Sequence, residues 1–129
     1  MNNYSFDTHS LVWYFQGKNT LSTKAFVCLE EVFSGKSFGY VSVIVILEAY
    51  HLSLKKNKKF IFPKFLEWLS VPSISIVPFD FAIAKECFLL PKELEIHDRV
   101  IVATAKTYET LLVTRDRVII ESKVIETIW

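Results

Sequence analysis

Residues 96–120, IHDRVIVATAKTYETLLVTRDRVII, carry two carboxylates in a segment whose predicted structure determines where both must lie. From Asp98 the pattern predicts a helix, because apolar residues cluster over 100–105 and nothing breaks the run before Thr110. Asp98 would then occupy the first turn, where the helix dipole and the unpaired N–H groups favour an anion. The apolar residues 111–113, followed by polar ones, are typical of a buried strand.

The lengths of these two elements bring Asp98 and Asp116 to the same level. A helix of about a dozen residues rises ~18 Å away from Asp98, at ~1.5 Å per residue. The strand from Thr110 to Asp116 returns by roughly 20 Å, at ~3.3 Å per residue. In a parallel sheet both acids would therefore lie at the carboxyl ends of the strands, where open α/β folds bind ligands.

The rest of the chain alternates in the same way. The pattern predicts strands at 4–7, 38–45, 73–78 and 124–129, and helices at 11–15, 22–35, 47–54, 63–69, 80–90 and 117–123. The boundary between the second strand and the helix after it lies between Ser42 and Leu47. We therefore expect an α/β fold, a three-layer α/β/α sandwich with a mostly parallel central sheet, in a single domain over residues 1–129.

The composition excludes several classes of protein. A chain of 129 residues that is 51% hydrophobic is long enough for a sizeable core and is not disordered. A net charge of +1 excludes a strongly basic protein that wraps nucleic acid, but not a nuclease with local basic patches. Cys28 and Cys87 lack the spacing of a disulfide scaffold, and neither a secretory signal nor a membrane-spanning run is visible. These features predict a cytoplasmic protein with reduced thiols.

Two further acids stand at notable positions. Asp7 follows the first predicted strand, and for a single aspartate in such a turn the simpler role is a helix N-cap. Glu48 lies within the apolar run VSVIVILEAYHL, residues 41–52, where a carboxylate is costly unless something satisfies it. A salt bridge to a downstream lysine or a solvent-facing helix turn would explain Glu48 without a functional role.

In the predicted fold Asp7, Glu48, Asp98 and Asp116 converge on one edge of the sheet. Two carboxylates ~4 Å apart repel by ~4 kcal/mol at an effective dielectric constant of about 20. The repulsion among four of them would offset a large part of the ~5–15 kcal/mol that stabilises a domain. A hard divalent cation, Mg²⁺ or Mn²⁺, removes this repulsion, prefers oxygen ligands and can activate water for attack at phosphorus.

The histidines and the lysine cluster point less clearly to a site. His9, His51 and His97 lack a paired zinc-ligand spacing, so each is expected at the surface or behind the metal ligands. The lysines at 55, 56, 58 and 59 are typical of a solvated helix end or loop, and contact with a phosphate backbone is the alternative.

Four segments, in this order, carry a family resemblance. They are FDTHSLVW at 6–13, Glu48 after an apolar strand, IHDRVIVATA at 96–105 and LLVTRD at 111–116. Together they resemble the PIN-domain ribonucleases, most closely the VapC-type toxins of bacterial toxin–antitoxin pairs. The resemblance covers essentially the whole chain.

The resemblance implies a metal-dependent endoribonuclease with a Mg²⁺ or Mn²⁺ site. It also implies a cytosolic protein that usually forms a homodimer and is inhibited by a cognate antitoxin, whose tail blocks the acidic groove. Asp7, Glu48, Asp98 and Asp116 match the family's acidic quartet, and Thr114 matches the hydroxyl that supports it. Where some relatives have a further acid just after Asp116, this sequence has residues 117–118, Arg-Val, which leaves the second metal position open.

The sequence therefore leads to a specific hypothesis. Asp7, Asp98 and Asp116 would hold the metal, Glu48 would complete its shell or orient the attacking water, and RNA cleavage would leave a 5′-phosphate. Residues 99 and 115, both arginine, are candidates for RNA phosphate contacts, with a helix-surface or salt-bridge role as the alternative. The main rival is a catalytically inactive PIN-like module that binds RNA or protein. A receiver-type phosphorylation domain is disfavoured, because its usual adjacent acid pair and late lysine are missing.

Overall fold

Five parallel strands form one sheet at the centre of the computed structural model, which describes residues 2–55 and 60–129. The strands are β1 (Asn3–Phe6), β2 (Phe38–Ser42), β3 (Ile74–Val77), β4 (Leu111–Val113) and β5 (Thr127–Ile128). Their order across the sheet is β3-β2-β1-β4-β5, and every pair of neighbours runs parallel. Three of the four clustered lysines, at 56, 58 and 59, lie outside the described residues.

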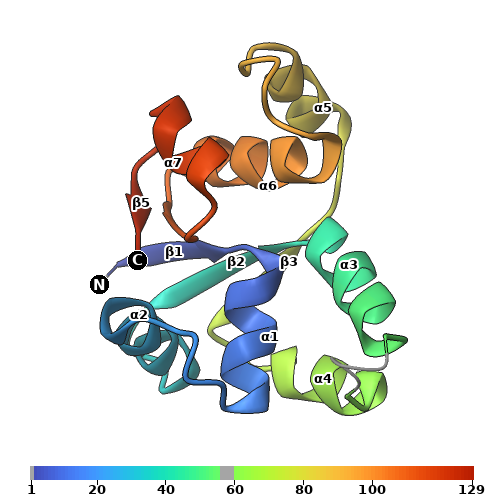
Figure 1. The fold of residues 1–129 in the computed structure, drawn as a ribbon, viewed down its shortest axis with the longest axis vertical. Helices are drawn as coiled ribbons and strands as arrows, with labels where there is room; N and C mark the ends of the chain where they lie inside the picture. The colour runs from blue at the N-terminus through green and yellow to red at the C-terminus, as the bar shows by residue number, and fades with distance from the viewer. Residues whose placement is uncertain (1, 56–59) are drawn as a thin grey trace.

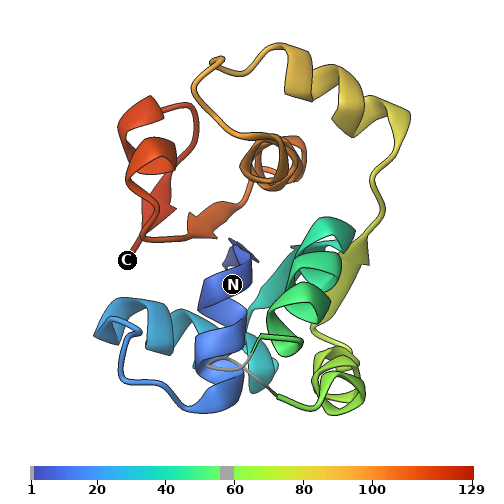
Figure 2. The same ribbon diagram turned by 45° about the vertical axis from the view of Figure 1, so that its right-hand side comes forward.

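Helices cover both faces of this sheet. They are α1 (Thr8–Gln16), α2 (Thr23–Phe33), α3 (Val43–Ser53), α4 (Phe62–Leu69), α5 (Phe81–Phe88), α6 (Ile96–Thr107) and α7 (Arg117–Ser122). Figure 1 shows α1 to α4 on one side of the sheet and α5 to α7 on the other, and the turned view in Figure 2 keeps the same separation. The predicted α/β/α sandwich is confirmed, with a sheet that is parallel throughout.

Local capping sets two boundaries that the sequence placed only approximately. The strand β2 ends at Ser42, whose hydroxyl accepts a hydrogen bond from the Ile44 backbone N–H and starts α3 there. The helix α6 begins at Ile96 rather than Asp98, because the Glu95 carboxylate caps it by accepting from the Asp98 N–H over 2.9 Å. Asp98 still lies in the first turn, as expected.

The core lies between the sheet and both helical layers. Its fully buried side chains include Phe6 in β1, Val41 in β2 and Leu112 in β4. Gly39 in β2 is needed for close packing, since a Cβ there would lie 2.8 Å from Cγ1 of Val32 in α2. Both cysteines are free thiols, as predicted. None of the described helices is long and apolar enough to cross a bilayer.

Candidate functional site

A pocket of about 1010 Å³ opens at the carboxyl ends of the strands, and all four predicted acids line it. The carboxylates come from four separate places in the chain: the end of β1, the middle of α3, the first turn of α6 and the start of α7. The lining residues are Asp7, Thr8, His9, Trp13, Leu47, Glu48, Tyr50, His51, Leu52, Lys55, His97, Asp98, Ile101, Arg115 and Asp116. The fold thus brings together the acids that the sequence analysis singled out.

Asp7 is both a helix cap and a wall of the pocket. Its Oδ1 atom accepts from the Ser10 backbone N–H over 2.9 Å and from the Ser10 hydroxyl over 2.6 Å. Its Oδ2 atom accepts from the buried Thr114 hydroxyl over 2.5 Å. Three donors therefore orient this carboxylate. The cap role that Asp7 was expected to have does not exclude a second role in the pocket.

Asp116 repeats this arrangement at the start of α7. Its Oδ1 atom accepts from the Ile119 N–H over 3.0 Å, and its own backbone N–H donates to the Thr114 hydroxyl oxygen over 3.0 Å. Thr114 therefore contacts both the side chain of Asp7 and the backbone of Asp116. This single hydroxyl fixes the relative position of two of the four acids.

The pKa of Asp98 depends on its burial and on the negative charges of the other acids in the cluster. The pKa of its carboxyl is raised to about 7, first by burial and then by the charges of Asp116, Glu95, Glu48 and Asp7, in that order. In the part of the chain that the structure describes, the charged neighbours that shift the pKa of Asp98 are thus all carboxylates. Among the described residues, no lysine or arginine forms an ion pair with Asp7, Asp98 or Asp116. A set of oxygen donors with unbalanced negative charge fits a hard divalent cation such as Mg²⁺ or Mn²⁺.

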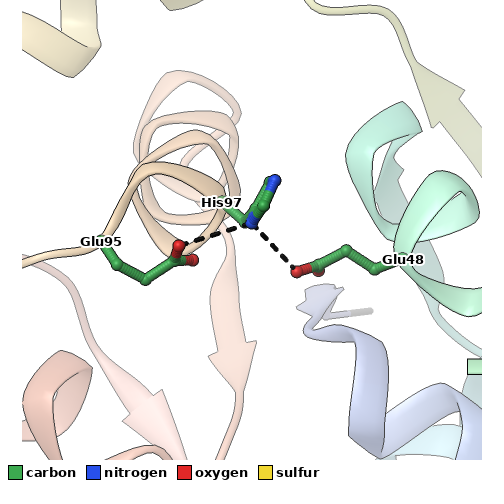
Figure 3. Close-up of side chains that lie close together, drawn as sticks. All are labelled: Glu48, Glu95 and His97. Atoms are coloured by element: carbon green, nitrogen blue, oxygen red, sulfur yellow. Dashed lines mark ion pairs between the residues drawn. The ribbon is translucent and has the colours of Figure 1, made fainter. Parts of the chain in front are cut away.

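Glu48 is held from two sides. The Thr8 hydroxyl donates to its Oε1 atom, and His97 Nδ1 lies 3.6 Å from its Oε2 atom. The downstream lysine that could have explained Glu48 is not its partner among residues 2–55 and 60–129. Figure 3 shows His97 between Glu48 on α3 and Glu95 at the start of α6, with Nδ1 lying 3.4 Å from Glu95 Oε2.

Glu95 was not predicted as a neighbour of the acids, and His97 was expected either at the surface or behind the metal ligands. One ligand atom from each of Glu48, Glu95 and His97 lies within 4.8 Å of the others, so this edge of the pocket could also hold a cation. The sequence offered one indication, since Glu95 stands three residues before Asp98 at a typical capping distance. The contact with Glu48 depends on the packing of α3 against α6 and could not be found in the sequence.

Arg99, one of the two arginine candidates for RNA phosphate contacts, does not line the pocket. Its guanidinium donates four hydrogen bonds of 2.7–3.1 Å to backbone carbonyls between residues 87 and 94. Three of these carbonyls belong to the segment that connects α5 to α6, so Arg99 ties that segment to α6. Arg115, in contrast, lines the pocket, with its guanidinium carbon 4.8 Å from the ring centre of Trp13.

The family model for the PIN domain matches residues 4–123, nearly the whole chain and every acid of the pocket. The chain belongs to the PIN domain family. No curated protein sequence matches it.

Solved structures with the same fold include chains from toxin–antitoxin complexes. A chain of VapBC2 from Rickettsia felis bound to a promoter DNA fragment has a TM-score of 0.71 and 21% identity, covering 98% of this chain and 97% of that one. A chain of FitAcB from Neisseria gonorrhoeae has a TM-score of 0.72 and 22% identity, covering 98% and 96%. A toxin–antitoxin complex from Klebsiella pneumoniae gives 0.65 and 25%, covering 88% and 86%. The predicted PIN family is thereby confirmed.

Proposed function

We propose that this PIN domain is a metal-dependent endoribonuclease that hydrolyses RNA phosphodiester bonds. Asp7, Asp98 and Asp116 would hold a Mg²⁺ or Mn²⁺ ion, directly or through water, and Glu48 would complete the shell or orient the attacking water. The observation that carries the proposal is the convergence of these four carboxylates on one pocket, where the described part of the chain places no lysine or arginine in an ion pair with the three aspartates.

A cation bound there would polarise a phosphoryl oxygen and lower the pKa of a coordinated water. The chain's own residues fix the ligands for it. A carboxylate has about four acceptor positions, so the three donors from Ser10 and Thr114 leave Asp7 one position for an ion. Preorganised ligands of this kind need little rearrangement when an ion binds.

The raised pKa of Asp98 supports the same assignment. Near pH 7 this carboxyl carries a proton for part of the time, because burial and then the charges of the neighbouring carboxylates raise its pKa. An ion that binds the cluster would displace that proton and restore the charged form. Hydrolysis by a water aligned beside Glu48 would leave a 5′-phosphate on the product.

The biological role that we propose is that of a toxin in a toxin–antitoxin pair. The similar structures of VapBC2 and FitAcB, together with the family resemblance, support this role. We place the protein in the cytosol, where free thiols such as Cys28 and Cys87 stay reduced. A cognate antitoxin and a second copy of this chain are the proposed partners, and exposed aromatic side chains support such contacts: Phe81 is 76% exposed and Phe88 89% exposed.

The catalytic proposal is tested with purified protein and mixed RNA in the presence of Mn²⁺. We expect cleavage that EDTA abolishes and that Asp98→Asn reduces by at least a hundredfold. The matched control is Asp80→Asn, which changes an acid that caps α5 outside the pocket. Cleavage that survives EDTA or Asp98→Asn would exclude the mechanism. Tight RNA binding without turnover and without a metal requirement would favour the inactive binding module.

The partner proposals have separate tests. Sedimentation equilibrium of the purified chain should give the mass of a dimer, and a monomer at every concentration would exclude the homodimer. Co-expression with the protein encoded by the neighbouring reading frame should give a stable complex in which Mn²⁺-dependent cleavage is suppressed. A neighbouring protein that does not bind would contradict the toxin role while leaving the nuclease proposal intact.

A further inference from the structure

One wall of the pocket is formed by an aromatic and cationic cluster that the acid site does not use. Trp13 on α1 stands at its centre. The His9 ring centre lies 5.3 Å from that of Trp13, and the Arg115 guanidinium carbon lies 4.8 Å from it. The ring of Trp129 meets Trp13 edge-on at 6.0 Å. We call His9, Trp13 and Arg115, all of which line the pocket, the Trp13 platform.

The platform is adjacent to the acids. His9 stands two residues after Asp7, and Arg115 immediately precedes Asp116. A group held against Trp13 would therefore lie beside a phosphate held at the carboxylates. The Arg115 side chain is exposed, while Trp13 is half-buried, so the platform combines a supported ring with an accessible planar cation.

Charge alone gives this pocket little attraction for RNA. The four acids that were predicted from the sequence line it. Among the described residues, the lysine and arginine that line it are Lys55 and Arg115. The formal net charge of the whole chain is only +1. In the metal-free pocket, the described residues would therefore bind a polyanion largely through contacts other than those with phosphate. Aromatic rings and guanidinium planes supply such contacts by stacking on nucleobases, whatever the sequence.

We propose that the Trp13 platform stacks a nucleobase of an unpaired RNA segment, next to the phosphate at the acid site. Bases within a duplex are already stacked on their neighbours, so only an unpaired strand can offer a free face. This inference rests on the proposed nuclease function for its substrate, but it concerns binding and is tested without cleavage.

The test measures binding by fluorescence anisotropy in EDTA, with three probes of the same length. They are a labelled single-stranded oligoribonucleotide, its abasic counterpart that keeps the sugar–phosphate backbone, and the same strand annealed to its complement. Wild-type protein should bind the base-bearing single strand most tightly. Trp13→Leu should weaken that binding on the order of tenfold and leave the abasic strand unaffected, because leucine keeps apolar volume but has no aromatic face.

Arg115→Lys provides a second, independent variant at an exposed position. Lysine keeps the charge but lacks the planar guanidinium, so the base-bearing strand should lose affinity while the abasic strand should not. This variant carries the test if circular dichroism shows that Trp13→Leu does not fold. A loss that is equal for both strands would mean that Arg115 contacts phosphate alone, and it would overturn the platform.

The chain offers matched controls away from the pocket. Phe81 on α5 is also an exposed aromatic residue with a cation above it, since Lys85 Nζ lies 5.0 Å from its ring centre, yet neither residue lines the pocket. Phe81→Leu and the exposed Arg117→Lys should bind all three probes as wild type does. Wild-type binding of the base-bearing strand by Trp13→Leu, or a preference of wild type for the duplex, would overturn the proposal.

The outcomes for the platform and for the nuclease are separable. Binding that depends on Trp13, without Mn²⁺-dependent cleavage, would support the platform and contradict the proposed function. Cleavage that needs Mn²⁺ and Asp98 but is indifferent to Trp13→Leu would support the nuclease and contradict the platform. In that second case the Trp13 platform would be assigned to contact with a protein partner.

Discussion

The Thr114 hydroxyl donates a hydrogen bond to Asp7 Oδ2 over 2.5 Å and joins two residues that lie 107 positions apart in the chain. The same oxygen accepts the backbone N–H of Asp116. The ends of β1 and β4, which are neighbours in the sheet, are therefore connected through the acid site itself. Stability and ligand geometry depend here on the same contact.

We expect Thr114→Val, which keeps the side-chain volume, to lower the free energy of unfolding by about 1–3 kcal/mol in the absence of metal. Asp7 loses one charge-assisted hydrogen bond, and the Asp116 N–H loses its acceptor. Mn²⁺ affinity should also fall, by about 10- to 100-fold, because Asp7 is less well oriented. Urea denaturation and metal titration measure the two effects.

The control for this variant is Thr107→Val, whose hydroxyl donates only to a carbonyl of its own helix over 2.8 Å. Its free energy of unfolding should change by less than about 0.5 kcal/mol. Equal behaviour of the two variants would show that the Thr114 contact does not organise the site.

Asp98 should make the metal-free protein less stable as the pH rises. Its pKa is 3.8 in the reference state and about 7 in the fold, so the folded protein holds a proton that the unfolded chain has lost between these values. Stability therefore falls as the pH rises through this window. Above pH 7 we expect the free energy of unfolding of Asp98→Asn to exceed that of wild type by about 1–2 kcal/mol. This range allows for solvent screening in an open pocket.

Urea denaturation in EDTA at pH 4 and at pH 8 tests this linkage. The advantage of Asp98→Asn should be present at pH 8 and should disappear near pH 4, where wild-type Asp98 is protonated in the folded state. A variant that is less stable than wild type at pH 8 would show that Asp98 has a stabilising partner.

Arg99→Lys should destabilise the fold rather than weaken RNA binding directly. Lysine cannot reach four carbonyls with a planar fork of donors, so we expect a loss of about 2–4 kcal/mol in the free energy of unfolding. Urea denaturation measures it, with the exposed Arg117→Lys as the control. Unchanged stability combined with weaker RNA binding would restore the phosphate-contact role that the sequence suggested.

Gly39→Ala should lower the free energy of unfolding by about 1–3 kcal/mol, because the added Cβ would crowd Val32 Cγ1 and approach Phe6 to 3.2 Å. The double variant Gly39→Ala with Val32→Ala should lose less stability than the sum of the losses of the two single variants, since the smaller side chain at 32 makes room for the added Cβ. A double-mutant cycle by urea denaturation checks this. Strict additivity would place the strain elsewhere.

The layout of the fold and the acids of the site could be predicted because they depend on local patterns. The carboxyl ends of parallel strands share one edge, so acids placed just after strands must approach one another. Asp7 and Asp116 each also cap a helix, and that local role gives the carboxylate its direction. Capping and catalysis were treated as alternatives at Asp7, but the structure combines capping with a place in the pocket.

The remaining features depend on packing between distant elements. His97 meets Glu48 only because α3 and α6 lie side by side, and no spacing in the sequence encodes that distance. The partners of Arg99 could not be predicted, because they are backbone carbonyls at the end of α5 and in the irregular segment after it, which carry no sequence pattern. The start of α6 was placed two residues late because Glu95 was not identified as its cap.

The most direct test of the central claim is a titration of the metal-free protein with Mn²⁺. The electron paramagnetic resonance signal of the free ion measures how much Mn²⁺ binds. We expect saturable binding at pH 8 that is weaker at pH 6, is lost in Asp98→Asn and Asp116→Asn, and persists in Asp80→Asn. Equal Mn²⁺ binding by all four proteins, or none by the wild type, would show that the four carboxylates of the pocket do not form a metal site.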